Sequence, residues 1–337
     1  MIVTSNNFEL KLEEIEKDLP TKKYHEHENI VLNLISGWFS KQKYFQHQTS
    51  GSTGRPKKIE ISREQIEISA RATMDFLDPE GSIRTSLLCL APRFIGGAMV
   101  VYRALIFNHD LHIAEPSSNL NSLLDSDQTY DLVSMVPMQF QQLSPSSIHK
   151  FKNVLIGGAP MPVDQTNYDT NIYSTYGMTE TVSHIALRRL DEDRFKTVGD
   201  AIVQLSEQGT LQIRGVITGG QWIQTNDIAE VLDERTFKWL GRADFVINSG
   251  GIKIHPEQVE SQLIDQLDGD FMATSIPDDR FGEKLILLIA EDDRPLDFSS
   301  ITPYHRPKEV YFNQTIFKTA GNKMDRNKTH EHFLSNL

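Results

Sequence analysis

Short apolar runs alternate with helical or loop segments through the first half of the chain. The clearest of these runs are residues 87–91, 111–114, 132–136 and 154–156. Ser62 is followed three residues later by Gln65, a spacing that matches a capping box and predicts a helix ending near Phe76. Residues 8–43, which have charged faces and an apolar end, are also predicted to be helical. The alternation predicts an α/β fold with a mainly parallel sheet and helices on its faces.

From Thr197 onward the pattern changes to short strands. These are predicted at residues 211–214, 229–232 and 237–240, with a hairpin connection at residues 233–236. A further unit begins after residues 241–244, and its expected elements are a helix at 256–267 and strands at 271–276 and 285–290. We therefore predict two domains, residues 1–242 and a smaller domain of residues 243–337.

Composition and charge exclude several classes of protein. Lys and Arg number 34 against 46 Asp and Glu, so the net charge is −12, and a net acidic chain argues against general nucleic-acid binding. The single cysteine, Cys89, lies in an apolar run and is predicted to be buried. The N-terminus lacks a signal-peptide core, and apolar stretches such as residues 285–290 are too short to span a membrane. We expect a cytoplasmic protein with no membrane insertion.

The most informative chemistry lies in residues 49–57. The run reads Thr49, Ser50, Gly51, Ser52, Thr53, Gly54, Arg55, Pro56 and Lys57. Hydroxyl donors, free backbone N–H groups and positive charge in one turn-forming segment suit a polyphosphate, although a surface turn is the alternative for such a run alone. The loop follows the strand-like residues 44–48, so it is predicted to leave a sheet edge where ligands bind. It is not a Walker A loop, because Arg55 and Pro56 follow Gly54.

Five segments in register resemble the adenylate-forming superfamily, which includes acyl-CoA synthetases, luciferases and peptide-synthetase adenylation domains. The segments are residues 49–57, 176–180, 225–227, 241–256 and 318–323. The resemblance covers roughly residues 45–328. It implies a large N-terminal α/β domain with a β-rich subdomain and a small mobile α+β C-terminal domain. The 48 residues ahead of the phosphate loop are fewer than most of the family has, so the N-terminus is read as truncated relative to the family.

The resemblance implies that ATP, Mg²⁺ and CoA take part in the reaction. A carboxylate would attack ATP to give an acyl-adenylate and pyrophosphate, and CoA would then receive the acyl group. The loop residues and Lys57 would hold the β- and γ-phosphates, and Thr179 would donate to the α-phosphate. Glu180 would bind Mg²⁺, which prefers one or two carboxylates together with phosphate oxygens. Tyr176, Gly177, Gly157 and Gly158 would complete the nucleotide site.

The resemblance also implies roles for residues in the second half of the chain. Asp227 and Arg242 would bind the ribose hydroxyls, and Lys323 would place positive charge on the developing acyl-phosphate oxygens. Asp244 would be the hinge about which the C-terminal domain rotates. The pair Gly250 and Gly251 would allow the pantetheine chain of CoA to approach the backbone.

Two of these motifs depart from the family pattern. Asn226 replaces the usual glycine before Asp227, and asparagine tolerates left-handed backbone geometry, so the turn can survive. The usual Ser/Thr-Gly-Lys becomes Gly321-Asn322-Lys323, which keeps the lysine in register.

The acid is less well determined by the sequence. Residues 134–139 and 155–162 resemble the short o-succinylbenzoate–CoA ligases of menaquinone biosynthesis. The acid pocket would be walled by Phe94-Ile95-Gly96-Gly97 and the Gly157-Gly158 edge. Arg93 is the candidate for binding a second carboxylate. Three alternatives stay open: another aryl or acyl acid, a carrier-protein thiol as acceptor, and an inactive nucleotide-binding protein of the same fold. A homodimer is also compatible with the sequence.

Overall fold

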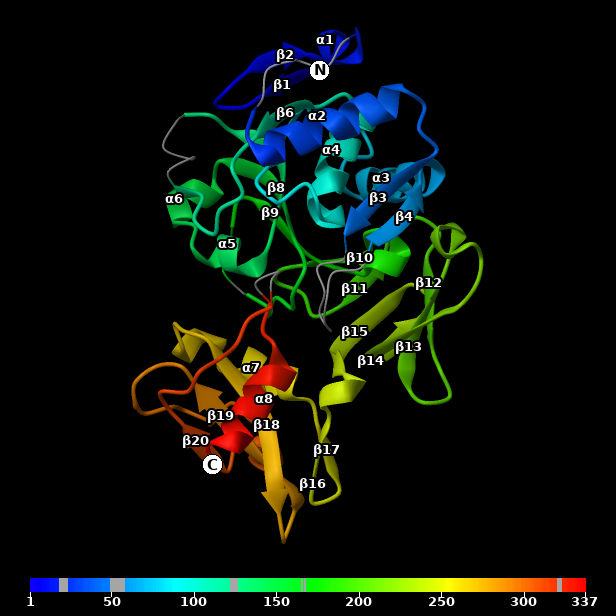
Figure 1. Cartoon of the computed structure of the whole chain (residues 1–337). Coiled ribbons are helices and arrows are strands. Elements are labelled where there is room, and N and C mark those ends of the chain that lie inside the picture. Colours follow the sequence, from blue (N-terminus) through cyan, green and yellow to red (C-terminus); the bar gives the residue numbers. More distant parts are fainter. Residues whose placement is uncertain (18–23, 49–57, 122–126, 165, 167, 320–322) are drawn as a thin grey trace. The chain divides into compact units, whose positions relative to one another are not determined.

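The computed structural model describes residues 1–17, 24–48, 58–121, 127–164, 166, 168–319 and 323–337. The chain forms two compact units (Figure 1). Among the described residues, the first unit comprises 1–202 and 214–222, and the second comprises 203–213 and 223–337. The domain boundary after residue 242 stays a prediction.

A parallel sheet is the centre of the first unit. Its strands run β1 (Ile2–Thr4), β6 (Asp110–Ile113), β5 (Thr85–Leu88), β7 (Tyr130–Met135), β8 (Phe151–Ile156) and β9 (Asn171–Gly177), each parallel to the next. Antiparallel strands extend it at both ends: β2 (Glu9–Lys11) beside β1, and β10 (His184–Arg189) and β11 (Phe195–Thr197) beyond β9. The apolar runs of the sequence form the inner strands, so the predicted parallel sheet is confirmed.

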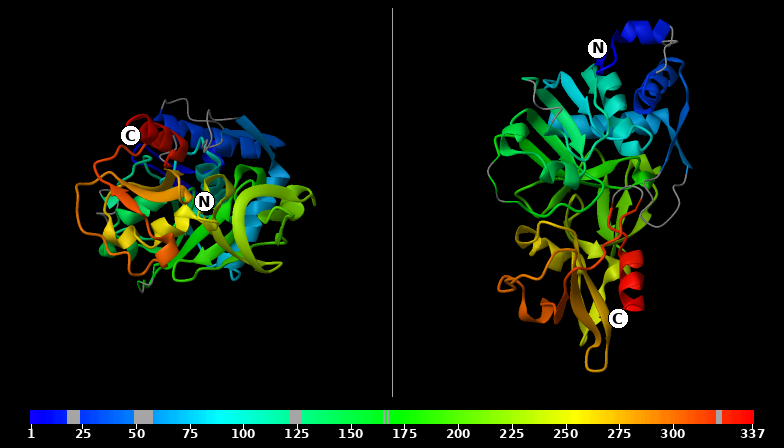
Figure 2. Two further views of the ribbon diagram at one scale, coloured as in Figure 1. Left: turned by 90° about the horizontal axis from the view of Figure 1, so that it is seen from below. Right: turned by 60° about the vertical axis from the view of Figure 1, so that its left-hand side comes forward.

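Helices cover both faces of this sheet (Figures 1 and 2). On one face lie α2 (Glu26–Phe39), α3 (Arg63–Leu77) and α4 (Ile95–Phe107), and on the other lie the short α5 (Pro137–Gln141) and α6 (Pro145–Ile148). Neighbouring strand residues alternate between the two faces: Leu88 packs with α2 and α4, whereas Leu87 packs with α5 and α6. Cys89 is fully buried next to this strand, as predicted.

The two predictions for the N-terminal helices had different outcomes. The capping box is confirmed: the Gln65 N–H donates to Ser62 Oγ at 3.1 Å and the Ser62 N–H donates to Gln65 Oε1 at 3.0 Å. The prediction of a helical segment from residue 8 is wrong at its start, where β2 precedes the short helix α1 (Leu12–Lys17). Glu9, Leu10 and Lys11 alternate in exposure with a period of two, which suits an edge strand paired with β1.

Residues 44–48 form a strand, as predicted, but not in the parallel sheet. Strand β3 (Tyr44–Gln48) pairs with β4 (Lys58–Ser62) as a separate antiparallel two-stranded sheet. The connection between them, residues 49–57, carries the predicted phosphate loop and lies outside the described residues. The Gln48 N–H donates to the carbonyl oxygen of Arg93 at 3.3 Å, so the end of β3 contacts the segment that follows β5.

The second unit is rich in β-structure. Its first group of strands is β12 (Ile202–Leu205), β13 (Thr210–Arg214), β14 (Ile223–Asp233) and β15 (Thr236–Arg242). A second sheet holds β16 (Ile247–Ser249), β17 (Ile252–Ile254), β18 (Phe271–Asp278), β19 (Gly282–Ile289) and β20 (Glu309–Tyr311). The helices are α7 (Pro256–Ser261), which is shorter than predicted, and α8 (Arg326–Ser335). Within the described ranges, no helix has the length and apolarity needed to cross a membrane.

Candidate active site

The carboxyl ends of four neighbouring parallel strands meet at one edge of the first unit's sheet. Because β5, β7, β8 and β9 are adjacent and parallel, the segments after them lie side by side. These segments carry the predicted acid-binding residues after β5, the glycine pair after β8 and the motif Tyr176–Glu180 at the end of β9. Ligands of open α/β sheets bind at this kind of edge.

The glycine pair after β8 brings the main chain close to its neighbours. The Gly157 N–H donates to the Met135 carbonyl oxygen at 3.0 Å, which ties this segment to the end of β7. A Cβ atom on Gly157 would lie 2.4 Å from Thr175 Oγ1, so a larger residue would displace that side chain. Gly158 has φ +90°, a backbone conformation that favours glycine.

The segment after β5 leads into α4. Phe94 precedes the first residue of this helix, and Gly96 is exposed in its first turn. Arg93 is exposed, with its guanidinium carbon 5.0 Å from the centre of the Phe94 ring. A Cβ atom on Gly97 would lie 2.5 Å from the Ala91 carbonyl oxygen, so glycine is required for the helix to begin this close to the preceding loop.

Thr179 and Glu180 lie on a tight turn between β9 and β10. Residues Thr179–Thr181 form a single 3₁₀ turn. The Thr181 N–H donates to the Met178 carbonyl oxygen at 3.2 Å, and the Val182 N–H donates to the Thr179 carbonyl oxygen at 2.9 Å. A Cβ atom on Gly177 would lie 2.3 Å from the Ser183 carbonyl oxygen, since the returning chain passes directly over this glycine. Gly177 is therefore a requirement of the turn geometry. Tyr176 is half-buried beside Phe195, with ring centres 5.9 Å apart.

The carboxylate of Glu180 is chemically suited to bind Mg²⁺. It is exposed at the tip of the turn. The described residues contain no group of three or more His, Cys, Asp or Glu side chains able to hold a metal ion. A Mg²⁺ ion at Glu180 would take its other ligands from phosphate oxygens and water, as Mg²⁺ usually does beside nucleotides.

A residue missed by the sequence reasoning is Arg103, in the middle of α4. Its side chain is buried, with 2% exposure, and its Nη2 donates to Ser134 Oγ on β7 at 3.2 Å. Its Nε and Nη1 are buried and have no hydrogen-bond partner among the described residues. Burial lowers the pKa of Arg103 to about 10, so the side chain stays charged at neutral pH. A buried cation without a counter-charge is costly.

Arg103 is connected to the strand edge through its neighbours. Ser134 precedes Met135, whose carbonyl oxygen accepts the Gly157 N–H. Burial, with the charge of Arg103, lowers the pKa of His184 to about 3, and His184 pairs across the sheet with Gly177. The sequence did contain a signal, because Arg103 interrupts an apolar run from residue 98 to 107 of α4.

In the second unit, Asp227 and Arg242 face each other on paired strands. Asp227 on β14 is directly opposite Arg242 on β15, with Oδ1 and Nη1 3.9 Å apart. The indole N–H of Trp239 donates to Asp227 Oδ1 at 3.1 Å. Arg242 Nη2 also donates to Asp244 Oδ2 at 2.8 Å, and Asp244 lies in the 3₁₀ turn Ala243–Phe245 after β15. The predicted ribose-binding pair and the predicted hinge residue are therefore in contact.

The other predicted residues of the second unit lie on its second sheet and near its C-terminal helix. Gly250 and Gly251 connect β16 to β17 with φ +60° and +82°, and the Gly250 N–H donates to the Phe281 carbonyl oxygen at 2.7 Å. Lys323 lies between β20 and α8, where its N–H donates to Thr319 Oγ1 at 3.2 Å. Burial lowers the pKa of the Lys323 ammonium.

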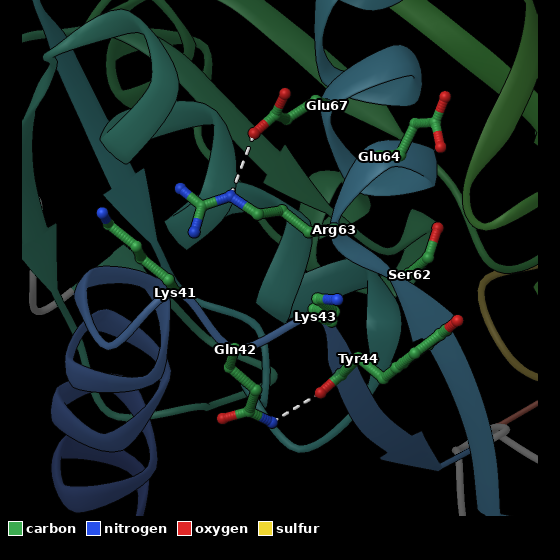
Figure 3. A pocket seen from close by; sticks show the side chains of 8 residues that line it. All are labelled: Lys41, Gln42, Lys43, Tyr44, Ser62, Arg63, Glu64 and Glu67. Atoms are coloured by element: carbon green, nitrogen blue, oxygen red, sulfur yellow. Dashed lines mark hydrogen bonds and ion pairs between the residues drawn. The ribbon is translucent and has the colours of Figure 1, made fainter.

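A hollow of about 570 Å³ lies elsewhere on the first unit (Figure 3). It is lined by Lys41, Gln42, Lys43, Tyr44, Ser62, Arg63, Glu64 and Glu67. Tyr44 pairs with Ser62 at the end of the β3–β4 ladder farthest from residues 49–57. The lining mixes both signs of charge, and Arg63 is bound to Glu67 at 3.1 Å, so this hollow offers no unpaired arginine to a ligand.

The chain is similar to known proteins in sequence and in structure. Residues 43–208 match the family model described as AMP-binding enzyme. A solved structure from Dyadobacter fermentans, an acyl-CoA synthetase (AMP-forming)/AMP-acid ligase II-like protein, is 31% identical, covers 93% of this chain and 96% of its own, and has a TM-score of 0.62. A 2-succinylbenzoate–CoA ligase from Listeria monocytogenes is 26% identical over 341 residues, or 88% of this chain and 72% of the relative.

One further structure shares the fold. The o-succinylbenzoate coenzyme A synthetase of Bacillus subtilis, solved in complex with ATP and magnesium ion, is 19% identical. Its TM-score is 0.70, over 85% of this chain and 69% of its own. These similarities confirm the predicted fold class.

Proposed function

Since the chain belongs to the AMP-binding family of acyl-CoA synthetases, we propose that it is an ATP- and Mg²⁺-dependent acid–CoA ligase. The reaction joins a carboxylate to the α-phosphate of ATP, with release of pyrophosphate, and then passes the acyl group to the thiol of CoA. The relatives' names support this reaction, and the carboxyl-edge placement of Thr179 and Glu180 supports a nucleotide at the same edge.

The first step brings two anions together, so the site must neutralise charge where the carboxylate attacks. The Thr179 hydroxyl would donate to an α-phosphate oxygen, and residues 49–54 with Lys57 would hold the β- and γ-phosphates. A Mg²⁺ ion held by Glu180 would supply positive charge to the phosphates. Asp227 and Arg242 would bind the ribose hydroxyls as an acceptor and a donor.

The second unit would supply the remaining groups. Lys323 would donate to the oxygens of the developing acyl phosphate, and its lowered pKa arises from burial. Asp244 would act as the hinge between the two steps, and the backbone at Gly250 and Gly251 would admit the pantetheine arm. A cytoplasmic location and a homodimer stay predictions.

The buried cation Arg103 favours a dicarboxylate as the substrate. A monocarboxylate uses its single carboxylate in the reaction, and a buried cation would then remain unpaired. A dicarboxylate of the 2-succinylbenzoate type would place its second carboxylate against one of the two unpartnered nitrogens of Arg103, Nε or Nη1. Arg93 stays a prediction for the same role, but its exposed side chain would bind an anion more weakly than a desolvated one.

The test is pyrophosphate release with ATP, Mg²⁺ and a panel of acids, with and without CoA. The panel holds o-succinylbenzoate, benzoate, phenylacetate and a medium-chain fatty acid, and Lys323→Ala is the comparison variant. We expect release with o-succinylbenzoate alone, faster with CoA and lost in the variant. Release only with another acid would overturn the substrate assignment, and thioester formed on a carrier protein but not on CoA would overturn the acceptor. ATP binding without release for any acid would support a non-catalytic protein.

A further inference from the structure

Val182 has a backbone conformation that valine rarely adopts. Its φ is +64° and its ψ −54°, and the Ser183 N–H donates to the Thr181 carbonyl oxygen at 2.7 Å across it. This is a three-residue γ-turn with positive φ, the strained form of the two mirror-image γ-turns. It is rare for any residue and an outlier for a β-branched one. Among the described residues, the other non-glycine positions with positive φ are Lys41, Asn108 and Asn313, none of which is β-branched.

The surrounding contacts hold Val182 in this conformation. Its side chain is 1% exposed, so burial of the two methyl groups opposes the strain. Thr181, on one side, is fully buried, and its hydroxyl bonds to the main chain at Met178 and Ser183. Backbone strain of this kind persists where the neighbouring structure over-determines it, and it clusters at functional sites.

The γ-turn is directly joined to the two residues that matter for the proposed reaction. The Val182 N–H donates to the carbonyl oxygen of Thr179 at 2.9 Å, which closes the turn carrying Thr179 and Glu180. The turn also directs the Ser183 carbonyl over Gly177, at the end of β9. A relaxed conformation at residue 182 would send the chain in another direction and move both side chains away from the strand edge.

We propose that Val182 is a positioning residue, whose strained turn fixes the Thr179 hydroxyl and the Glu180 carboxylate for an Mg²⁺-bound nucleotide. The proposal rests on the proposed function, because it takes the roles of Thr179 and Glu180 from it. It adds a buried residue that no sequence motif singled out and that acts through the main chain of the turn.

Three variants separate positioning from simple packing. Val182→Gly accepts a positive φ with less strain but loses the anchoring side chain, so the turn gains freedom. Val182→Ile keeps the β-branched anchor and should restore wild-type behaviour. Ile185→Ala removes a buried side chain, 3% exposed, from the following strand and is the control for lost packing.

Two measurements are made on the full chain: hydrogen exchange of the amides of residues 178–183, and calorimetric binding of ATP over a range of Mg²⁺ concentrations. For Val182→Gly we expect exchange in this segment to rise at least tenfold and ATP binding to need about tenfold more Mg²⁺. Val182→Ile and Ile185→Ala should keep the wild-type Mg²⁺ dependence. Wild-type exchange and Mg²⁺ dependence in Val182→Gly would overturn the proposal, as would an equal shift in Ile185→Ala.

Neither readout requires turnover. If the wild-type protein binds Mg²⁺ and ATP but activates no acid, the proposed ligase fails while the expected Val182→Gly shift still supports the positioning role. If the wild-type protein turns over and Val182→Gly behaves like it in both measurements, the ligase stands and the positioning role is overturned.

Discussion

The side-chain amide of Asn226 donates to the carboxylate of Asp244, with Nδ2 3.0 Å from Oδ1 and 3.3 Å from Oδ2. Glycine, which has no side chain, could not make this contact. Asp227 is held by two other contacts, because the Thr225 hydroxyl accepts its N–H at 3.0 Å and the Trp239 indole N–H donates to its carboxylate. Asn226 and Arg242 thus both hold the residue that we propose as the hinge.

Asn226→Ala should loosen the turn at Asp244. The lost bond contributes about 0.5 to 1.5 kcal/mol, which corresponds to roughly a two- to tenfold change in the local opening equilibrium. We expect the amides of residues 243–246 to exchange faster by that factor, as measured by hydrogen exchange. Asn248→Ala, at an exposed position on β16, is the control and should leave these amides unchanged. Equal exchange in wild type and Asn226→Ala would show that Arg242 alone holds the turn.

Arg103→Met should separate substrate recognition from stability. Replacing a buried, unpaired cation by an apolar side chain of similar length removes a desolvation cost, so we expect an unchanged or raised unfolding temperature. The KM for o-succinylbenzoate should rise about ten- to a hundredfold, since a hydrogen bond between charged groups contributes about 1.5 to 3 kcal/mol.

Arg93→Ala is the matched comparison for Arg103. Its side chain is exposed, and we expect little change in the KM for the dicarboxylate. If Arg93→Ala raised this KM and Arg103→Met did not, the second carboxylate would belong to Arg93, as the sequence alone had suggested.

The sequence correctly predicts those elements that are determined by the local pattern of apolar and polar residues. Apolar runs bounded by turn residues predict β7 and β8 because both faces of a parallel strand are buried. The pairing partner is not encoded in a strand's own pattern, so residues 44–48 are correctly predicted as a strand, whereas their pairing with β4 was not predicted. Arg103 was missed for a related reason. A single charged residue in an apolar helix stands out only when the structure shows that its side chain is buried without a partner. The placements of Lys323 and of the phosphate loop relative to the nucleotide stay predictions.

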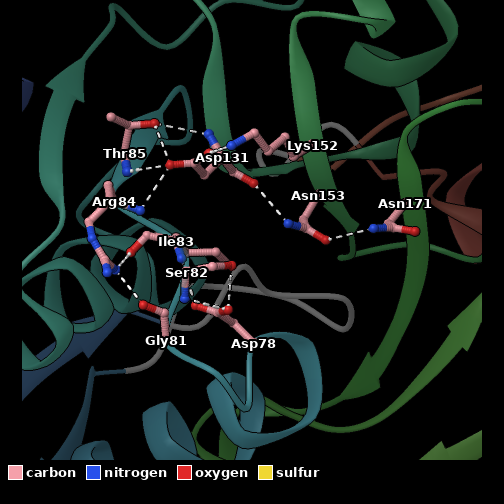
Figure 4. Close-up of polar contacts among 10 residues, drawn as sticks. All are labelled: Asp78, Gly81, Ser82, Ile83, Arg84, Thr85, Asp131, Lys152, Asn153 and Asn171. Atoms are coloured by element: carbon pink, nitrogen blue, oxygen red, sulfur yellow. Dashed lines mark hydrogen bonds and ion pairs between the residues drawn. The ribbon is translucent and has the colours of Figure 1, made fainter.

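Asp131 should be a major stabilising residue at the amino ends of the strands, away from the site (Figure 4). Its Oδ2 accepts N–H bonds from Arg84 and Thr85 at 2.9 and 3.0 Å, and its Oδ1 is 2.5 Å from Lys152 Nζ. Burial opposes ionisation, but the hydrogen bonds from Lys152, Arg84 and Thr85 together lower the pKa of Asp131 below its ordinary 3.8.

Asp131→Asn should lower the free energy of unfolding at pH 7 by about 1.5 to 3 kcal/mol, because backbone donors would lose a charged acceptor. Lys152→Ala should cost less than about 1 kcal/mol, since the lysine side chain is 74% exposed. Urea unfolding of both variants measures the difference. The folded pKa lies below the unfolded one, so the stabilisation is complete above pH 3.8 and is lost as the pH falls through the folded pKa. A larger effect in Lys152→Ala would assign the stabilisation to the ion pair instead.

Three buried histidines should make the fold sensitive to mild acid. His47 bonds Tyr102, His109 bonds Ser86 and His184 bonds Thr73, at 3.1, 3.0 and 2.8 Å. Burial lowers the pKa of His47 to about 4, and burial with the charge of Arg103 lowers the pKa of His109 to about 4 and that of His184 to about 3. In the folded protein all three therefore stay neutral at pH values where an unfolded chain would bind protons.

The sign of the effect follows from these values. The unfolded pKa is 6.5, so the neutral histidines contribute full stability above pH 6.5 and lose it as the pH falls toward 4. Each contributes a slope of up to about 1.4 kcal/mol per pH unit, or about 4 for the three together. His109→Asn keeps an acceptor for Ser86 and should remove about one third of the slope in guanidinium unfolding between pH 7 and about 4.5. His149→Asn, at an exposed position, is the control and should leave the slope unchanged. An equal slope in His109→Asn and wild type would mean that His109 does not stay neutral in the folded protein.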